Sequence, residues 1–495
     1  MQPQRLISAL IVTILVGLLQ IAPAVVPPPD GGYPGRNTAE GQKALLSLTT
    51  GTDNAALGYA SLQTLTTGTL NTGVGAWTLA LNTADYNTAC GGGALLFNGT
   101  GIDNTAVGMA SLLSNTTGEG NTATGAFALY SNTEGQFNTA NGEFTLYFNT
   151  AGERNTAIGD SALYENTEGN RNTAVGNAAL LLNTIGNDNT AVGTGALFSN
   201  DGNDNTAIGA DALSANNIGV ANTAVGRDAL TSNSGGQANT AVGFRALFSN
   251  VDAGFNTAVG FDAMIENEAG THNTAIGNNA LRLNRGSDNT AVGDNALFSN
   301  GTGGQNTALG EGAGFAQTTG TGNVYIGLGV PGVAGENNAC YIASIFGQTS
   351  AGGAQVFINA NNKLGTNTSS KRFKEDIQPM NNASQALFSL KPVKFRYRHE
   401  IDPERREQLG LVAEDVEEIN PDLVVRDKEG KPYSVRYDQV NAMLLNEFLR
   451  AHRKVQELES RMTEQQKQIE SLSASLQKVS AQLEMSRSQV VTNDS

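Results

Sequence analysis

The side chains best suited to covalent chemistry lie in one short stretch, residues 368–377 (TSSKRFKEDI). A serine hydroxyl is a poor nucleophile until a base removes its proton. A lysine can act as that base only when desolvation or nearby positive charge lowers its pKa well below ~10.4. Lys374 follows Ser369 by five residues, and Lys371 and Arg372 place positive charge between them. The spacing indicates Ser369 and Lys374 as a candidate catalytic pair, and a basic loop that leads into a helix is the alternative.

Elsewhere the sequence offers no zinc-ligand spacing, and its other reactive residues are scattered. His272, His399 and His452 are expected to be solvated surface residues. Cys90 stands where most copies of a repeat described below carry Val, so we predict a small buried residue. Cys90 and Cys340 lie too many repeats apart to form a disulfide within one chain. We therefore predict no metal ion and no cofactor.

Composition and charge divide the chain at the same stretch. The protein has 495 residues, 59 glycines, 15% charged residues and a net charge of -16. The part from Lys371 onward holds 20 basic and 21 acidic residues, whereas the part before it holds 10 and 25. The acidic balance therefore belongs to the glycine-rich part. Nucleic acid and an anionic bilayer would both repel an acidic surface of this kind, so neither is expected as a partner.

The glycine-rich part is a regular repeat. Its unit, seen well in residues 189–200 (NTAVGTGALFSN), begins with an asparagine that recurs eighteen times from Asn37 to Asn323. Fourteen of the seventeen steps are 17 residues long and three are 16. Such regularity indicates one small structural unit stacked many times. We take the array to span residues 37–327.

The unit itself predicts a mainly β fold. NTAVG is a short β-prone segment in which alternation puts Thr and Val on one face and Asn, Ala and Gly on the other. The Ala-Leu pair that follows is expected to be buried, as one helical turn or a second short strand. Stacked units would then enclose an apolar column that includes Val192, Leu197, Ile208 and Leu213. A left-handed β-solenoid or β-roll about 85–90 Å long is the simplest solution.

The array resembles the head repeats of trimeric autotransporter adhesins, and more closely the NTAVG-type repeats of bacterial and phage fibre proteins. This resemblance implies that three chains pack side by side, with the small Ala and Gly faces towards the axis. Three functions of the array compete: an ice-binding threonine ladder, calcium binding, and a structural and adhesive rod. An ice-binding face is expected to need two threonine ranks, and calcium sites to need a GGxGxD pattern that is missing here. We favour the rod, with Asp103, Asp188, Asp204 and Asp288 as solvated turn residues.

After the array, residues 328–368 contain two alternating, strand-like runs, which predict a capping β subdomain. Residues 369–450 then resemble the intramolecular chaperone domain of phage tailspikes and fibres, the S74 peptidase family. The matching motifs, in the family's order, are SSKRFKEDI (369–377), ALFSLKPVKFRYR (386–398), GLVAEDVEEINPDLVV (410–425) and SVRYDQVNAMLLNEF (434–448).

The resemblance implies a small α+β domain that helps its own chain to trimerise and then cuts the chain once. The family's serine and lysine fall on Ser369 and Lys374, so the protein would be at most a single-turnover self-cleaving Ser-Lys peptidase without an external substrate. Two positions depart from the common pattern. Ser370 stands where many members have Asp, and residues 407–409 contain no His before Gly410. A domain that no longer cleaves and serves only as a permanent trimer clasp is the alternative.

The N-terminus predicts secretion. Residues 1–24 have a positive start at Arg5, an apolar stretch over residues 6–21, and an Ala-Pro-Ala cleavage site. The apolar stretch is shorter than the ~20 residues that a spanning helix needs, so we expect a cleaved signal peptide and no lasting membrane span. Residues 25–36 form a proline- and glycine-rich lead-in.

The C-terminus predicts a coiled coil over residues 441–490. Mostly apolar residues recur there at alternating steps of three and four. These positions are Asn441, Leu444, Phe448, Ala451, Val455, Leu458, Met462, Gln465, Ile469, Leu472, Leu476, Val479, Leu483, Ser486 and Val490.

Taken together, these patterns predict a secreted or cell-surface homotrimeric fibre that binds cell-surface or matrix polymers through its shaft. A phage-type tail fibre is the alternative, and such a fibre would need no signal peptide. A regulator tethered to the same kind of domain would need DNA-binding and membrane segments that the sequence does not suggest.

Overall fold

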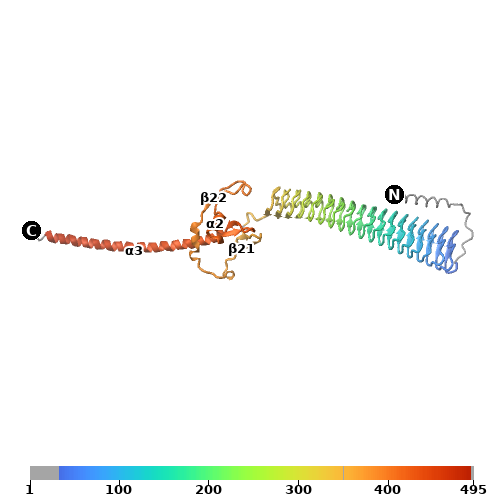
Figure 1. The fold of residues 1–495 in the computed structure, drawn as a ribbon, viewed down its shortest axis with the longest axis horizontal. Coiled ribbons are helices and arrows are strands. Elements are labelled where there is room, and N and C mark those ends of the chain that lie inside the picture. The colour runs from blue at the N-terminus through green and yellow to red at the C-terminus, as the bar shows by residue number, and fades with distance from the viewer. Residues whose placement is uncertain (1–32, 349, 492–495) are drawn as a thin grey trace. The chain divides into compact units, whose positions relative to one another are not determined.

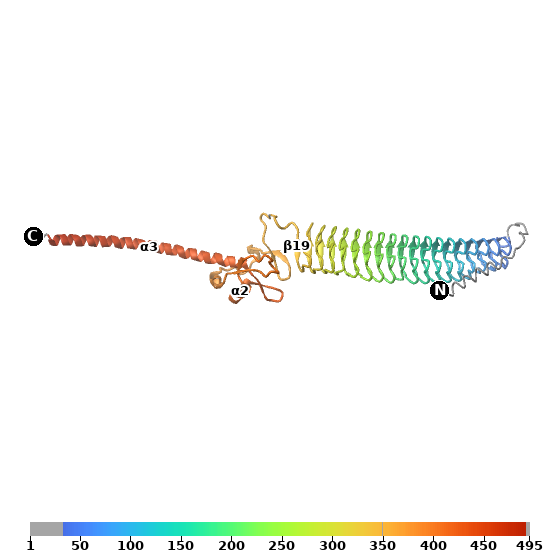
Figure 2. The same cartoon turned by 90° about the horizontal axis from the view of Figure 1, so that it is seen from above.

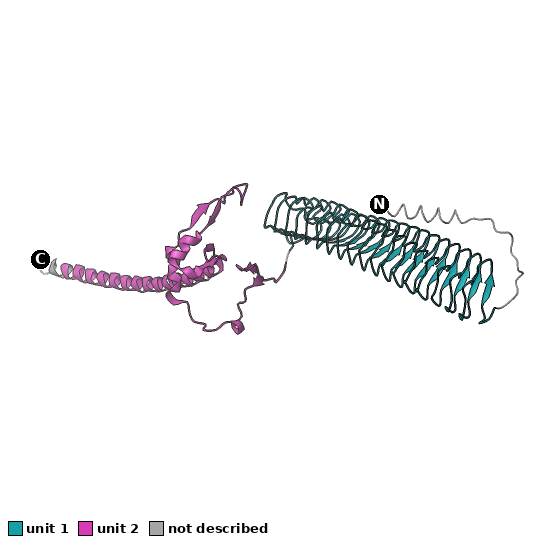
Figure 3. Cartoon of the chain, turned by 45° about the vertical axis from the view of Figure 1, so that its right-hand side comes forward, with its two compact units in different colours: residues 1–348 teal, residues 349–495 magenta. Residues whose placement is uncertain are grey.

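The computed structural model describes residues 33–348 and 350–491 and divides into two compact units, residues 1–348 and 349–495 (Figure 3). The expected signal peptide, residues 1–24, and most of the lead-in, residues 25–36, lie outside the described residues. Within the described ranges, no helix combines the length and the apolar character needed to cross a membrane.

The first unit is a parallel β-solenoid, as predicted, in which each turn of the chain adds one three-residue strand to a single sheet (Figures 1 and 2). Neighbouring strands pair in register, so that Thr190 lies beside Thr206 and Val192 beside Ile208. The strands are β1 (Thr38–Glu40), β2 (Ala55–Leu57), β3 (Thr72–Val74), β4 (Thr88–Cys90), β5 (Thr105–Val107), β6 (Thr122–Thr124), β7 (Thr139–Asn141), β8 (Thr156–Ile158), β9 (Thr173–Val175), β10 (Thr190–Val192), β11 (Thr206–Ile208), β12 (Thr223–Val225), β13 (Thr240–Val242), β14 (Thr257–Val259), β15 (Thr274–Ile276), β16 (Thr290–Val292), β17 (Thr307–Leu309), β18 (Val324–Ile326) and β19 (Cys340–Ile342).

The middle residue of each strand points into the solenoid, and its two neighbours point outward. In β10, Ala191 is completely buried, Thr190 is partly exposed and Val192 is 37% exposed. Asn189, just before the strand, is also completely buried. Because successive side chains of a strand alternate between its faces, an inward Asn189 fixes Ala191 as inward and its neighbours as outward.

This orientation corrects three expectations. Leu197 and Leu213 are buried as predicted, but Val192 and Ile208 are exposed and do not belong to the apolar column. Cys90 occupies the same outward position, so its free thiol is exposed and not buried. The alanine faces fill the interior of each solenoid and therefore cannot be turned towards an axis shared by three chains.

Buried asparagine side chains hold successive turns together. Asn189 donates from Nδ2 to Oδ1 of Asn172 (3.1 Å) and to the carbonyl oxygen of Gly202 (2.9 Å). Its own Oδ1 accepts from the backbone N–H of Asn205 (3.0 Å). This pattern recurs along the solenoid, so most leading asparagines satisfy a buried neighbour and their own amide at once.

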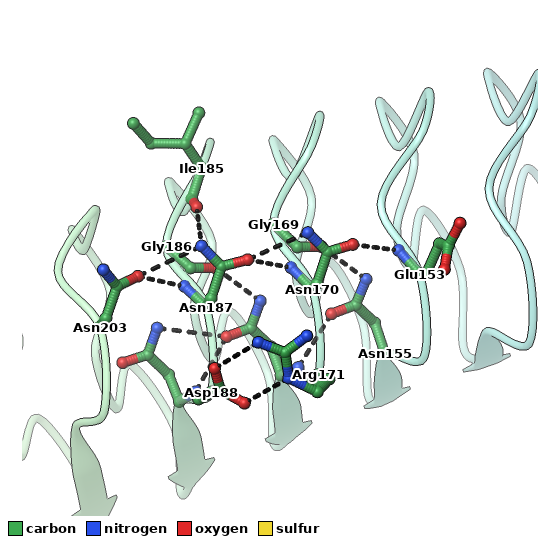
Figure 4. A network of polar contacts seen from close by, with 12 residues as sticks. Glu153, Asn155, Gly169, Asn170, Arg171, Ile185, Gly186, Asn187, Asp188 and Asn203 are labelled. Carbon is green, nitrogen blue, oxygen red and sulfur yellow. Dashed lines mark hydrogen bonds and ion pairs between the residues drawn. The ribbon is translucent and has the colours of Figure 1, made fainter.

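Further ladders line the turns, as Figure 4 shows for β8 to β11. Asn170 donates to Asn187 (3.0 Å), and Oδ1 of Asn203 accepts from the backbone N–H of Asn187 (2.7 Å). Beside them, Arg171 pairs with Asp188 of the next turn through two hydrogen bonds of 2.6 Å. The Arg171 guanidinium lowers the pKa of Asp188 below its ordinary value. The aspartate that the sequence suggested as a solvated turn residue therefore has a specific partner.

The Ala-Leu segment forms neither a helix nor a strand. Its leucine adopts positive φ, 51° at Leu197, and the backbone N–H of Leu197 donates to the carbonyl of Ala212 on the next turn (2.9 Å). The 16-residue steps lose their residue just beyond this segment. Asn200 bonds the carbonyl of Gly202 two residues ahead, whereas Asn183 bonds that of Gly186 three residues ahead. The deletion thus shortens a turn and leaves the stack intact.

The solenoid has one more strand than the asparagine repeat indicated. Ala339 stands in place of the leading asparagine, yet its backbone N–H donates to Oδ1 of Asn323 (2.8 Å), and β19 follows it. Near this end the interior changes, because the completely buried Tyr325 replaces alanine and Gly314 replaces leucine. A Cβ on Gly314 would come within 2.8 Å of the Tyr325 ring, so the larger residue occupies the space that the smaller one leaves.

The expected capping segment, residues 328–368, is divided between the units. Its first strand-like run supplies β19, and its second forms a hairpin, β20 (Val356–Ile358) with β21 (Leu364–Thr366), in the second unit. The hairpin strands are wholly exposed.

The second unit is a small mixed α/β region followed by a long helix, as predicted. It also contains β22 (Val393–Phe395), β23 (Gln408–Gly410), β24 (Val424–Arg426), β25 (Pro432–Val435), the 3-10 helices η1 (Lys371–Phe373), η2 (Asn381–Ser389) and η3 (Pro421–Leu423), and the α-helices α2 (Ala413–Ile419) and α3 (Tyr437–Val491). β22 pairs with β23 and β24 with β25, both antiparallel. The core is formed by Val416, Leu423, Val424, Val435, Val440 and Met443.

Candidate functional site

Ser369 and Lys374 lie at opposite ends of one helical turn. Ser369 follows β21 by three residues, η1 comes next, and Lys374 is its C-cap. The turn is closed by backbone bonds from Phe373 to Ser370 (3.0 Å) and from Lys374 to Lys371 (3.2 Å). The local sequence therefore brings the two predicted residues onto the same short loop.

The loop does not assemble them into a catalytic pair within one chain. Both residues are exposed, and no hydrogen bond joins their side chains in the described structure. The guanidinium of Arg372 lies 4.6 Å from the centre of the Phe373 ring, a cation–π contact. Lys374 is exposed among the described residues, whereas a lysine base requires desolvation.

Apolar side chains near the pair are also left uncovered. Phe373 is 59% exposed and Ile377 is 57% exposed. Burial of such residues against other chains would remove water from the loop, because apolar area is driven out of contact with water. Ser369 and Lys374 therefore lie beside exposed apolar side chains that another chain could cover.

A partly buried polar network that the sequence did not predict joins η2 to α3. The hydroxyl of Ser384, completely buried, donates to Glu447 and accepts from Asn446 Nδ2 (2.7 Å). Glu447 also accepts from Arg450 (2.9 Å). The Ser384 hydrogen bond and Arg450 lower the pKa of Glu447 below its ordinary value. The partners of Ser384 are more than sixty residues away, so no local pattern could have revealed them.

A second contact supports the start of α3. The phenol oxygen of Tyr437 accepts a hydrogen bond from the backbone N–H of Leu411 (3.0 Å). Gly410 makes this approach possible, because a Cβ there would lie 3.0 Å from that oxygen and 3.2 Å from the Phe395 ring. Gly410 and Tyr437 both belong to the motifs described above, which gives those positions a physical role.

Next to this contact the unit has an apolar groove of about 470 Å³. Its lining includes Leu387, Leu390, Val393, Leu409, Val440 and Leu444, with Lys394 as the charged residue. Leu444 is also the first apolar position of the heptad pattern on α3. The groove therefore adjoins the helix face on which other chains are expected.

The heptad positions of α3 face solvent along nearly its whole length. Val455 and Leu458 are each 50% exposed, Met462 is 72% exposed and Leu476 is 68% exposed. In water, an isolated helix with a continuous apolar stripe is unfavourable unless another helix covers the stripe. The helix confirms the predicted conformation, and its exposed stripe fits the predicted coiled coil.

Comparison with known proteins covers the first three of the four S74-like motifs, and the motif at residues 434–448 lies beyond the match. Residues 369–425 match the family Peptidase S74, described as chaperone of endosialidase. The match begins at Ser369 and ends within β24. No curated protein and no solved structure matched the chain significantly.

Proposed function

Because the chain carries a Peptidase S74 chaperone domain behind a long β-solenoid, we propose that it is a secreted, homotrimeric surface fibre that processes itself once. The C-terminal unit drives trimer assembly and then cuts the chain at or beside Ser369. The observation that carries this proposal is the exposed heptad stripe of α3, which further copies of the helix would cover. The solenoid is the lasting product, and its repetitive surface binds cell-surface or matrix polymers.

The cleavage step follows from the chemistry of the two residues. Lys374, once neutral, takes the proton of the Ser369 hydroxyl, and the oxygen attacks a neighbouring backbone carbonyl. The C–N bond breaks as a proton passes to the leaving amine, and water then hydrolyses the ester. Since Lys374 is exposed in one chain, assembly must come first to desolvate it. This order makes cleavage a report that the fibre is complete.

The test is the intact mass of purified wild-type protein and of Ser369→Ala and Lys374→Ala variants, together with the native mass in solution. We expect a wild-type chain ending near residue 369 and two uncut variants. Ser370→Ala is the matched control and should still be cut, since this neighbouring serine has no role in the proposed step.

An uncut wild-type trimer would favour the alternative of a permanent clasp. The residues that favour this alternative are Ser370, in place of the family's usual Asp, and Glu407-Gln408-Leu409, which lack its His. A monomeric wild-type chain would contradict the trimeric fibre altogether.

A further inference from the structure

We infer that the outward face of β1 to β19 is the surface on which three copies of this chain pack along the shaft. This inference rests on the proposed homotrimer and adds to it the contact surface and its residues. We call this surface the strand face and define it by the first and third residues of each strand.

The strand face is regular because its strands pair in register. One rank is threonine in sixteen of the nineteen strands, and the rank beside it is mainly Val, Ile and Leu. Strands β9 to β12 show the pattern, with Thr173, Thr190, Thr206 and Thr223 in one rank and Val175, Val192, Ile208 and Val225 in the other. Short in-register strands with β-branched side chains present an even surface for another chain.

Charge is almost absent from this face although the shaft is strongly acidic. Two outward positions on each of nineteen strands give 38 positions, and only Glu40 in β1 is charged. The other acidic and basic residues of the array lie in its turns, for example Asp160, Arg227 and Asp294. Identical acidic rods repel one another where their charges meet. The strand face is the surface along which copies can approach without that cost.

The face is also apolar enough and large enough to hold chains together. Val107, Ile158, Ile208 and Ile276 are 39–43% exposed in a single chain. With ~4.8 Å per turn and ~10 Å per strand, the face covers roughly 900 Å² in each chain. In a trimer that area is divided between two neighbours, and its total is close to the ~800 Å² that each partner buries in a standard interface. A solitary shaft would leave the mainly apolar rank, which Thr124 and Asn141 interrupt, in water.

Both cysteines of the protein lie on the strand face, and this makes the inference testable. Cys90 is the third residue of β4 and Cys340 is the first residue of β19. In parallel copies held in step, the three Cys90 side chains lie at the same level. The packing therefore predicts that Cys90, exposed in one chain, is covered and close to its equivalents in the trimer.

The experiment uses the full chain with Cys340→Ser, so that Cys90 is the single thiol. A matched control carries Cys90→Ser, Cys340→Ser and Glu168→Cys, which moves the thiol to an exposed turn between β8 and β9. Native mass is measured first by light scattering. The rate of maleimide alkylation is then compared, and linked chains are counted after treatment with a short bismaleimide.

We expect a trimeric mass for both proteins, alkylation of Cys90 at least tenfold slower than that of the turn thiol, and linked chains only through Cys90. A trimer in which Cys90 reacts as fast as the control and does not link would overturn this inference and leave the trimeric fibre standing. A monomeric mass would overturn both. If full denaturation does not restore fast alkylation of Cys90, the protection does not come from packing and the inference fails as well.

Discussion

At the scale of single residues, the polar network between η2 and α3 is the best-defined feature of the C-terminal unit. Ser384 is completely buried, and its hydroxyl serves Glu447 and Asn446 together. Removing the Ser384 hydroxyl takes one hydrogen bond from each of these two partly buried partners.

We predict that Ser384→Ala destabilises the C-terminal unit by about 1 kcal/mol. Urea unfolding followed by the helical circular dichroism signal would measure it. Ser389→Ala is the matched control, because Ser389 belongs to the same η2 but is exposed. Equal losses in the two variants would show that the buried network contributes nothing specific.

The same network predicts a dependence on acid. The Ser384 hydrogen bond lowers the pKa of Glu447 from its ordinary 4.5, so the folded state favours the carboxylate. Its contribution is present above pH 4.5 and is lost as the pH falls below that value through the folded pKa. Unfolding measured from neutral to acidic pH should therefore show a loss that Glu447→Gln abolishes. An identical acid profile in wild type and variant would contradict this assignment.

Tyr325 predicts the opposite dependence at the end of the solenoid. Burial, with Glu336 and Tyr341, raises the pKa of Tyr325 to about 12 from 10.0. The neutral phenol is therefore favoured in the fold, and stability should be lost as the pH rises from 10 towards 12. No hydrogen-bond partner for its hydroxyl is found among the described residues, so Tyr325→Phe should cost little. Between about pH 9 and about pH 11, the melting temperature should fall more for the wild type than for Tyr325→Phe. Parallel falls would point to another titrating group.

At the scale of elements, buried asparagines join successive turns of the solenoid in addition to the backbone hydrogen bonds between turns. Asn189 links three turns, through Asn172 before it and Asn205 after it. The inward side chain of Asn189 also places Ala191 on the inner face, because side chains alternate along a strand.

We predict that Asn189→Ala destabilises the shaft by about 2–3 kcal/mol, because it leaves buried partners on both sides unsatisfied. Asn217→Ala is the matched control, since Asn217 lies in an exposed turn and bonds Ser234 (3.1 Å) at the surface. Differential scanning calorimetry should show a clear fall in melting temperature for the first variant alone. A similar fall for both would mean that the buried asparagine bonds contribute no more to stability than the surface bond.

The sequence revealed the stacking unit because its period is almost constant, but it did not reveal which strand face is inside. Alternation separates Val192 from Ala191 without saying which is buried, and hydrophobicity alone favours the larger residue. The side-chain amide of Asn189 finds its hydrogen-bond partners inside the solenoid, so Ala191, two residues later, also faces inward. Motifs likewise placed Ser369 and Lys374 on one loop, whereas the Ser384 network joins distant segments and had no local signal.

At the scale of the whole molecule, each of the two units exposes a regular row of apolar side chains. α3 exposes its heptad stripe, and the shaft exposes the strand face. In the proposed homotrimer, copies of the same chain would cover both surfaces.

We predict that Ile469→Glu with Leu476→Glu prevents both trimer formation and cleavage, since charges in the heptad stripe oppose helix association. Ser471→Glu is the control, because this residue lies outside the heptad positions. Native and intact mass would report both properties on one sample. Cleavage in a monomeric Ile469→Glu, Leu476→Glu protein would show that the site is complete within one chain.

Tyr325 and Gly314 stand near the last turn in place of the alanine and leucine of other turns, and this bears on how the length of such a shaft can change. Turns between the ends present nearly the same asparagine, alanine and leucine to their neighbours, so one such turn can replace another. The turns that contain Gly314 and Tyr325 differ from the others and are not interchangeable with them. A gene can therefore gain or lose a whole repeat and change the length of the shaft by ~4.8 Å, while its last turns keep their own sequence.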